Sequence, residues 1–159
     1  MSHTRNVLAA LAVAAIFSLA QTSEADAGYR QYYGSWSYHP SYRYYYRPYY
    51  YKPYSSYSGY KYHYCIHYPS RPRYVYYYNP HKRRYWGRFD LEGKEGAQYS
   101  LLKEEDQAEK LTDIPESAFP KPAAMPAVPE SEDGETIEPP EGVPEQDLPE
   151  GAPTGTPQP

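Results

Sequence analysis

A segment of 62 residues, 28–89, contains 22 tyrosines and 11 lysines or arginines but no aspartate or glutamate. Ile66 and Val75 are its only aliphatic side chains. Because aliphatic side chains make up most of an ordinary protein core, this composition predicts that the phenol rings face outward. We therefore expect a chain that adheres through its surface and buries no large core.

Charge divides the chain into three parts. The 159 residues carry a formal net charge of -4, the sum of -1 over residues 1–27, +11 over residues 28–89 and -14 over residues 90–159. Such asymmetry is typical of interaction segments and tails. The acidic part can neutralise the basic part, either within one chain or between chains.

Residues 1–27 have the pattern of a helical secretory signal peptide. Arg5 precedes an apolar run of 14 residues from Val7, and small side chains allow cleavage after Ala20 or Ala27. The run is shorter than the ~20 residues that a membrane-spanning helix needs. We therefore expect a protein that is secreted or lies in the periplasm or cell envelope, with no membrane span after cleavage.

Residues 28–59 are of low complexity and contain two successive pentads of the form Tyr-Tyr-cation-Pro-Tyr, beginning at Tyr45 and Tyr50. Proline at this spacing prevents a helix and removes donors from a β-ladder. The pattern predicts an extended, irregular ribbon whose cation–π contacts, each worth ~0.5–1 kcal/mol, act together. The candidate adhesive residues are Tyr45, Tyr46, Arg47, Tyr49, Tyr50, Tyr51, Lys52 and Tyr54, with Trp86 further along the chain.

From Tyr60 to Tyr68 aromatic or apolar residues alternate with Lys61, His63, Cys65 and His67, as in a β-strand with two different faces. Turn residues then separate the further strands expected at 74–78, 84–91 and 97–102. Together they predict a small antiparallel meander over residues 60–102. Its candidate core residues are Tyr76, Tyr78, Trp86, Phe89, Leu91, Tyr99 and Leu101.

The remaining sequence predicts little folded structure. Residues 103–111 are charged and free of proline, which favours one short helix. Residues 112–159 contain 12 prolines and 11 acidic residues and are expected to form a disordered, extended tail. The predicted fold class is therefore a mostly disordered, low-complexity chain with at most a small all-β meander and one short helix.

His63, Cys65 and His67 share one face of the first predicted strand and form a candidate site for zinc or copper. The alternative is that histidine serves here as one more polar aromatic side chain, and no Cys-x-x-Cys pair completes a metal site. Cys65 is the only cysteine. It is therefore a free thiol, a metal ligand or the link to a second chain through an intermolecular disulfide.

Two functions remain after motifs are considered, since no phosphate-binding loop, nucleophile elbow or zinc-protease helix occurs and we expect no enzyme. The first is an exported structural or adhesive envelope protein that binds itself or envelope polymers, such as polysaccharide or another polyanion. The alternative is a small extracytoplasmic binding module for polysaccharide or a metal ion. Export argues against nucleic acid as the partner, although interleaved bases and aromatic residues also suit single strands.

Three stretches, Tyr77–Pro80, Tyr85–Lys94 and Ile114–Pro120, carry a resemblance. Together they resemble uncharacterised tyrosine-rich secreted proteins of planctomycete-type bacteria, over roughly residues 40–140. The resemblance implies bacterial export, and it implies no activity, cofactor or functional residue.

Overall fold

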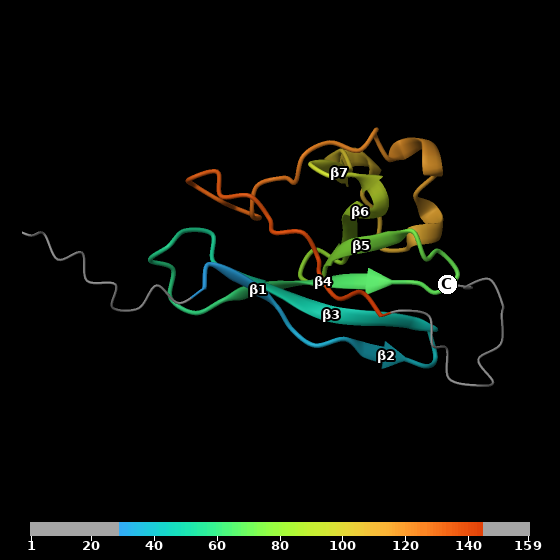
Figure 1. The fold of residues 1–159 in the computed structure, drawn as a ribbon, viewed down its shortest axis with the longest axis horizontal. Helices are drawn as coiled ribbons and strands as arrows, with labels where there is room; N and C mark the ends of the chain where they lie inside the picture. The colour runs from blue at the N-terminus through green and yellow to red at the C-terminus, as the bar shows by residue number, and fades with distance from the viewer. Residues whose placement is uncertain (1–28, 145–159) are drawn as a thin grey trace, which may run out of the picture.

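The computed structural model describes residues 29–144, and both the expected signal peptide and the end of the expected tail lie outside this range. Seven strands form one antiparallel sheet in the order β1-β3-β4-β5-β6-β7, with β2 paired to β3 beside β1 (Figure 1). Consecutive strands from β3 onward are neighbours, as in a meander. The strands are β1 (Gln31–Tyr33), β2 (Ser37–His39), β3 (Tyr44–Tyr51), β4 (Lys61–His67), β5 (Tyr74–Asn79), β6 (Arg84–Lys94) and β7 (Ala97–Leu101).

The prediction of a mostly disordered chain is wrong, because tyrosine replaces the missing aliphatic residues in the core. Most buried phenols form hydrogen bonds to one another or to polar side chains, which offsets the cost of removing their hydroxyls from water, whereas the buried Tyr99 hydroxyl has no partner within the described residues. Tyr49 Oη donates to Gln31 Oε1 at 2.7 Å, and the hydroxyls of Tyr68 and Tyr85 lie 2.8 Å apart. The buried tyrosines are Tyr49, Tyr51, Tyr68, Tyr76, Tyr77, Tyr85 and Tyr99.

The proline-containing ribbon expected over residues 28–59 instead supplies β1, β2 and β3. Pro48 pairs with Tyr64 in the middle of β3 and lies opposite Gly34, at the break between β1 and β2. The carbonyl of Pro48 accepts a hydrogen bond from the Gly34 amide at 2.8 Å. Because the nitrogen and carbonyl of one strand residue point the same way, the Pro48 nitrogen also faces this break, where no strand partner needs an N–H. A Cβ at Gly34 would lie 2.7 Å from Pro48 Cγ, so glycine is required there.

Alternation along the strands creates two packed faces. The first face of the sheet carries a cluster of Ile66, Tyr68, Tyr76 and Tyr85, and the second face carries another that includes Tyr49, Cys65, Val75, Tyr77 and Phe89. Each cluster is completed by residues that follow β7. We call residues 102–119 the first cover segment and residues 123–143 the second cover segment.

The first cover segment packs on the first face through Leu102, Leu111 and Ile114. The single helix expected over residues 103–111 is wrong, because the segment contains only short 3-10 turns at Glu104–Asp106, Leu111–Asp113 and Glu116–Ala118. Each turn lets one short stretch follow the sheet surface, which a straight helix would not do. Residues 29–144 contain no helix with the length and apolar character to span a membrane.

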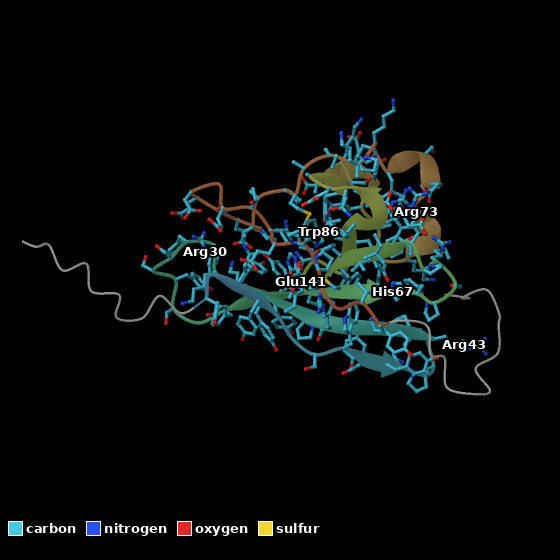
Figure 2. The ribbon with its side chains drawn as sticks, viewed as in Figure 1. Arg30, Arg43, His67, Arg73, Trp86 and Glu141 are labelled. Atoms are coloured by element: carbon cyan, nitrogen blue, oxygen red, sulfur yellow. The ribbon has the colours of Figure 1, made fainter. Side chains whose placement is uncertain are left out.

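The second cover segment packs on the second face, so the predicted disorder is also wrong for residues 112–144. Val128 and Ile137 are each only 1% exposed. They belong to a small hairpin in which the Val128 amide donates to Glu135 O at 2.7 Å and the Ile137 amide donates to Pro126 O at 2.9 Å. Figure 2 shows the side chains, Trp86 among them, that fill the space between the sheet and this segment.

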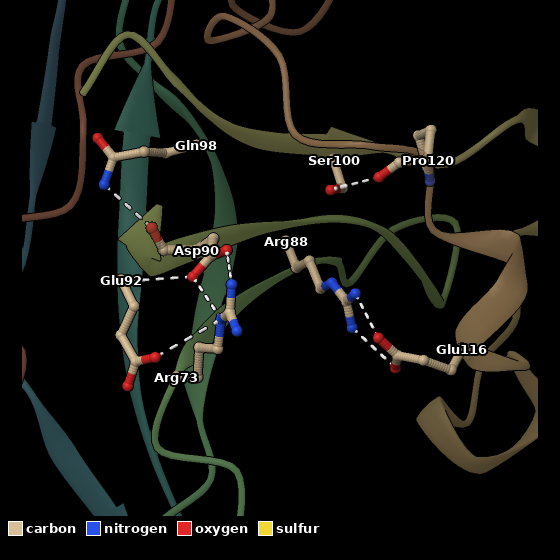
Figure 3. Close-up of polar contacts among 8 residues, drawn as sticks. All are labelled: Arg73, Arg88, Asp90, Glu92, Gln98, Ser100, Glu116 and Pro120. Atoms are coloured by element: carbon tan, nitrogen blue, oxygen red, sulfur yellow. Dashed lines mark hydrogen bonds and ion pairs between the residues drawn. The ribbon is translucent and has the colours of Figure 1, made fainter. Parts of the chain in front are cut away.

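Ion pairs join the basic strands to the acidic sequence that follows them. Figure 3 shows three of them, in which Arg88 donates to both carboxylate oxygens of Glu116 at 2.9 and 2.5 Å and Arg73 binds Asp90 and, at 3.9 Å, Glu92. The fold therefore neutralises much of its charge asymmetry within one chain. The pairs are Arg30–Asp133, Lys61–Glu130, Arg73–Asp90, Arg73–Glu92, Arg83–Glu109, Arg84–Glu104 and Arg88–Glu116.

Candidate functional site

A pocket of about 530 Å³ lies between the first face of the sheet and the first cover segment. This volume is within the usual range for small-molecule sites. Strands β2 to β6 and their turns supply one wall, and residues 109–112 supply the other. The lining residues are His39, Tyr42, Tyr44, Tyr46, Tyr64, Ile66, Tyr68, Arg71, Tyr78, Tyr85, Glu109, Lys110, Leu111 and Thr112.

The rings in the pocket present both flat faces and edges. Tyr42 stacks on Tyr44 with ring centroids 5.8 Å apart and an interplanar angle of 14°. Tyr44 meets Tyr46 and Tyr68 edge to face, at 6.1 and 5.4 Å. Because these side chains come from alternate positions of β3 and from neighbouring elements, the pleat of the sheet holds them on one side. The pocket is therefore a preformed aromatic surface.

Burial keeps the pocket phenols protonated. It raises the pKa of Tyr44 to about 12, with Tyr68 as a further contributor, and it also raises the pKa values of Tyr64, Tyr68 and Tyr85. A neutral phenol can both donate and accept a hydrogen bond. The pocket thus offers polar hydroxyls around apolar ring faces.

Few charged side chains line the pocket, and most of them are positive. Arg71 and Lys110 contribute positive charge to the lining, while Glu109 is paired with Arg83. Glu109 is the single carboxylate in the lining of the described pocket.

The candidate adhesive residues are divided between the two faces and do not form one outward surface. Tyr46 alone of the nine lines the pocket. Arg47, Tyr49, Tyr51 and Trp86 are buried, Tyr45, Tyr46, Tyr50 and Lys52 are half-buried, and Tyr54 is exposed. The other six pocket tyrosines were not among the predicted site residues. Alternation along the sequence is the signal for some of them, because Tyr44 lies two positions before Tyr46 and therefore on the same face of the sheet.

Arg47 is buried against the second face without a carboxylate partner among residues 29–144. Its guanidinium lies 4.3 Å from the Tyr33 ring and 4.7 Å from the Trp36 ring. Its Nε and Nη2 atoms are buried and donate no hydrogen bond within the described chain. Contact with the two aromatic faces supplies the stabilisation that a carboxylate would otherwise provide.

His63, Cys65 and His67 lie on the second face of β4 and are all buried. His63 Nε2 is 3.2 Å from the Tyr51 hydroxyl, and His67 Nδ1 is 3.1 Å from the carbonyl of Tyr74. Across residues 29–144, no three His, Cys, Asp or Glu side chains are grouped as metal ligands. Each histidine therefore has one ring nitrogen in a hydrogen bond within the fold. A metal site there remains a prediction.

Cys65 is completely buried, and burial raises the pKa of its thiol to about 12, although nearby Arg47 opposes the shift. A protonated, inaccessible thiol reacts slowly. An intermolecular disulfide through Cys65 therefore requires the sheet to open.

No protein-family model, no curated protein and no solved structure matches this chain.

Proposed function

We propose that this protein is a binding module for glycans and that the tyrosine-lined pocket is its site. The supporting observation is that seven tyrosines converge on one pocket from four strands, β3 to β6, and the turns beside them. A ring face stacks on the C–H face of a sugar, and phenol hydroxyls can bond the sugar hydroxyls around it. The pattern of residues 1–27 supports action outside the cytoplasm, where such polymers occur.

The experiment is calorimetry with short cello-, xylo-, chito- and galacturono-oligosaccharides. Tyr42→Ala should weaken binding about tenfold, because Tyr42 is 55% exposed and stacks in the pocket without supporting the core. Tyr54→Ala is the matched control, since Tyr54 is also exposed but lies outside the pocket lining. Failure of all four sugars to bind, or equal loss in both variants, would contradict the proposal.

A second candidate function is adhesion through exposed tyrosines. Tyr29, Tyr42 and Tyr54 are 80%, 55% and 36% exposed, so each can contact another surface. Adhesion of this kind is multivalent and weakened by salt where it includes cations. Light scattering of the protein at low ionic strength should reveal assemblies that dissolve on addition of salt. Scattering that stays at the monomer level under all conditions would eliminate this candidate.

A further inference from the structure

Four tyrosines outside the pocket form a row on the same first face of the sheet. We call them the tyrosine track: Tyr32, Tyr50, Tyr60 and Tyr62. Tyr32 stacks on Tyr50 at 4.8 Å and meets Tyr60 edge to face at 5.0 Å. Tyr50 and Tyr62 are partners across β3 and β4, with ring centroids 6.2 Å apart. Within the described chain, none of the four belongs to either packed cluster. Tyr32 is 39% exposed and the other three are half-buried, so part of each ring faces solvent.

The track continues into the pocket without interruption. Tyr62 lies 5.6 Å from Tyr64, which lines the pocket, and Tyr64 in turn lies 5.8 Å from Tyr46. Along β3, which follows the long axis of the molecule (Figure 1), Tyr44 and Tyr50 are six residues apart. At ~3.3 Å per residue this corresponds to about 20 Å, which is enough for several consecutive sugar units.

Three cations that form no ion pair with any residue the structure describes belong to this path or to the turn beside it. Lys52 Nζ is 5.0 Å from the Tyr60 ring, and Arg71 lines the pocket. Lys82 follows His81, whose ring contacts Tyr62 at 5.4 Å. Over residues 29–144, Lys52, Arg71 and Lys82 form no ion pair. Positive charge at both ends of the path, with Lys82 in the turn whose His81 contacts Tyr62, is complementary to a polymer that carries repeated negative charge.

From this arrangement we infer that the pocket and the tyrosine track together bind an internal stretch of an acidic, unbranched polysaccharide. The inference rests on the proposed function and names its substrate class. The pocket holds one sugar unit or a few, and the track stacks on the units that follow. Carboxylates of the polymer meet Lys52, Lys82 and Arg71 while its ring faces meet the tyrosines.

The test compares digalacturonate, hexagalacturonate and cellohexaose by calorimetry. The wild type should bind hexagalacturonate about tenfold more tightly than digalacturonate, because the longer chain reaches the track. Cellohexaose, which has no charge, should bind more weakly than hexagalacturonate, and only the acidic hexamer should lose affinity strongly as salt rises. Equal affinity for the two galacturonates would overturn the inference and leave the proposed function intact. Absence of binding by all three would contradict both.

Variants of the tyrosine track and of Lys52 test which residues produce the higher affinity for the hexamer. Tyr62→Ala should reduce affinity for the hexamer much more than affinity for the dimer, and an unchanged circular dichroism spectrum shows that the variant is folded. Tyr62→Phe keeps the ring and should retain most of the higher affinity for the hexamer. Lys52→Gln should reduce the salt dependence for the hexamer. A single-stranded oligothymidylate of similar charge that binds as tightly as hexagalacturonate would overturn the assignment to a sugar polymer.

Discussion

Arg30 and Asp133 form a two-point ion pair across 103 positions of the sequence, with Nη1–Oδ2 at 2.7 Å and Nη2–Oδ1 at 2.9 Å. Asp133 lies at the tip of the hairpin in the second cover segment. Arg30, which is labelled in Figure 2, immediately precedes β1. Arg30 lowers the pKa of Asp133 well below its usual value. The pair links the basic start of the sheet to the acidic segment that closes over its second face.

Truncation of Ile137 should destabilise the fold. Ile137 is 1% exposed in the second-face cluster, so Ile137→Ala should lower the free energy of unfolding by about 2–4 kcal/mol in urea denaturation. Glu132→Ala, at an exposed position of the same segment, is the control and should have little effect. Equal stability of Ile137→Ala and wild type would mean that the second cover segment does not pack on the sheet in solution.

Removal of the Glu116 charge should leave Arg88 without its carboxylate. Arg88 is buried between the rings of Tyr74 and Phe119, at 3.9 and 4.0 Å. Glu116→Gln should therefore cost about 1–2 kcal/mol of unfolding free energy, a value reduced because the Glu116 side chain is 67% exposed. Glu105→Gln is the control, since Glu105 is exposed and has no ion pair within residues 29–144. A loss of the same size in the control would refute a specific role for Glu116.

A methyl group at position 87 should not fit. The Cβ of Gly87→Ala would lie 2.3 Å from the Tyr99 hydroxyl oxygen and 2.7 Å from two ring carbons. We expect a loss of about 1–3 kcal/mol in thermal or urea unfolding, because Tyr99 is buried and cannot move freely. Addition of Tyr99→Phe, which removes the nearest atom, should recover part of the loss. An unchanged midpoint for Gly87→Ala would show that β6 and β7 pack differently.

Stability should fall as the pH is lowered through the range in which His63 titrates. Burial lowers the pKa of His63 from 6.5 to about 3, with smaller contributions from His81 and Lys82. Between these values the unfolded chain binds a proton that the folded chain does not, so this contribution is complete above pH 6.5 and is lost toward pH 3. The slope should approach ~1.4 kcal/mol per pH unit.

Measurement of urea unfolding from pH 6.5 to about 5 separates this effect from carboxylates, because paired Asp90 and Glu116 have lowered pKa values and affect stability at lower pH. His63→Phe should remove the uptake of about one proton on unfolding, so the slope of unfolding free energy against pH should become smaller. Since the pKa of buried His67 is also lowered, a smaller slope should persist in the variant. An identical slope in both proteins would show that His63 is not buried in the neutral form.

Cys65 should resist alkylation in the native protein. Its sulfur is enclosed by the second-face cluster and its thiol is protonated at neutral pH. Iodoacetamide followed by mass spectrometry should label Cys65 only after urea is added. Rapid labelling of the native protein would instead place Cys65 at an accessible surface and support intermolecular disulfide formation.

The local pattern of the sequence accounts for the positions of several strands. Residues 60–102, in which alternation predicted strands, contain β4 to β7. The prediction that Leu101 is a core residue is wrong: Leu101 is 49% exposed, and the neighbouring Leu102 is buried in its place, at 3% exposed. The chain leaves β7 at this point, so the alternation of faces no longer applies.

The N-terminal half of the sheet could not be predicted from composition. A proline in a strand is tolerated where no partner needs its N–H, and the break between β1 and β2 opposite Pro48 exists only once the sheet is assembled. The same limit applies to the candidate site, because the pocket needs the Leu111 stretch placed against Tyr44 and Tyr64, which are distant in the sequence.

The sequence by itself determined the chemical character of this protein: aromatic side chains with hydroxyls, positive charge in the first half and negative charge in the second. Tertiary structure decided which rings are buried, which line the pocket and which cations are neutralised. The reason is that a tyrosine suits both a core and a surface. Its place depends on whether a hydrogen-bond partner and a covering segment reach it, and here those come from residues up to about a hundred positions away, as Gln31 and Glu138 show for the contacts around Tyr49 and Tyr33.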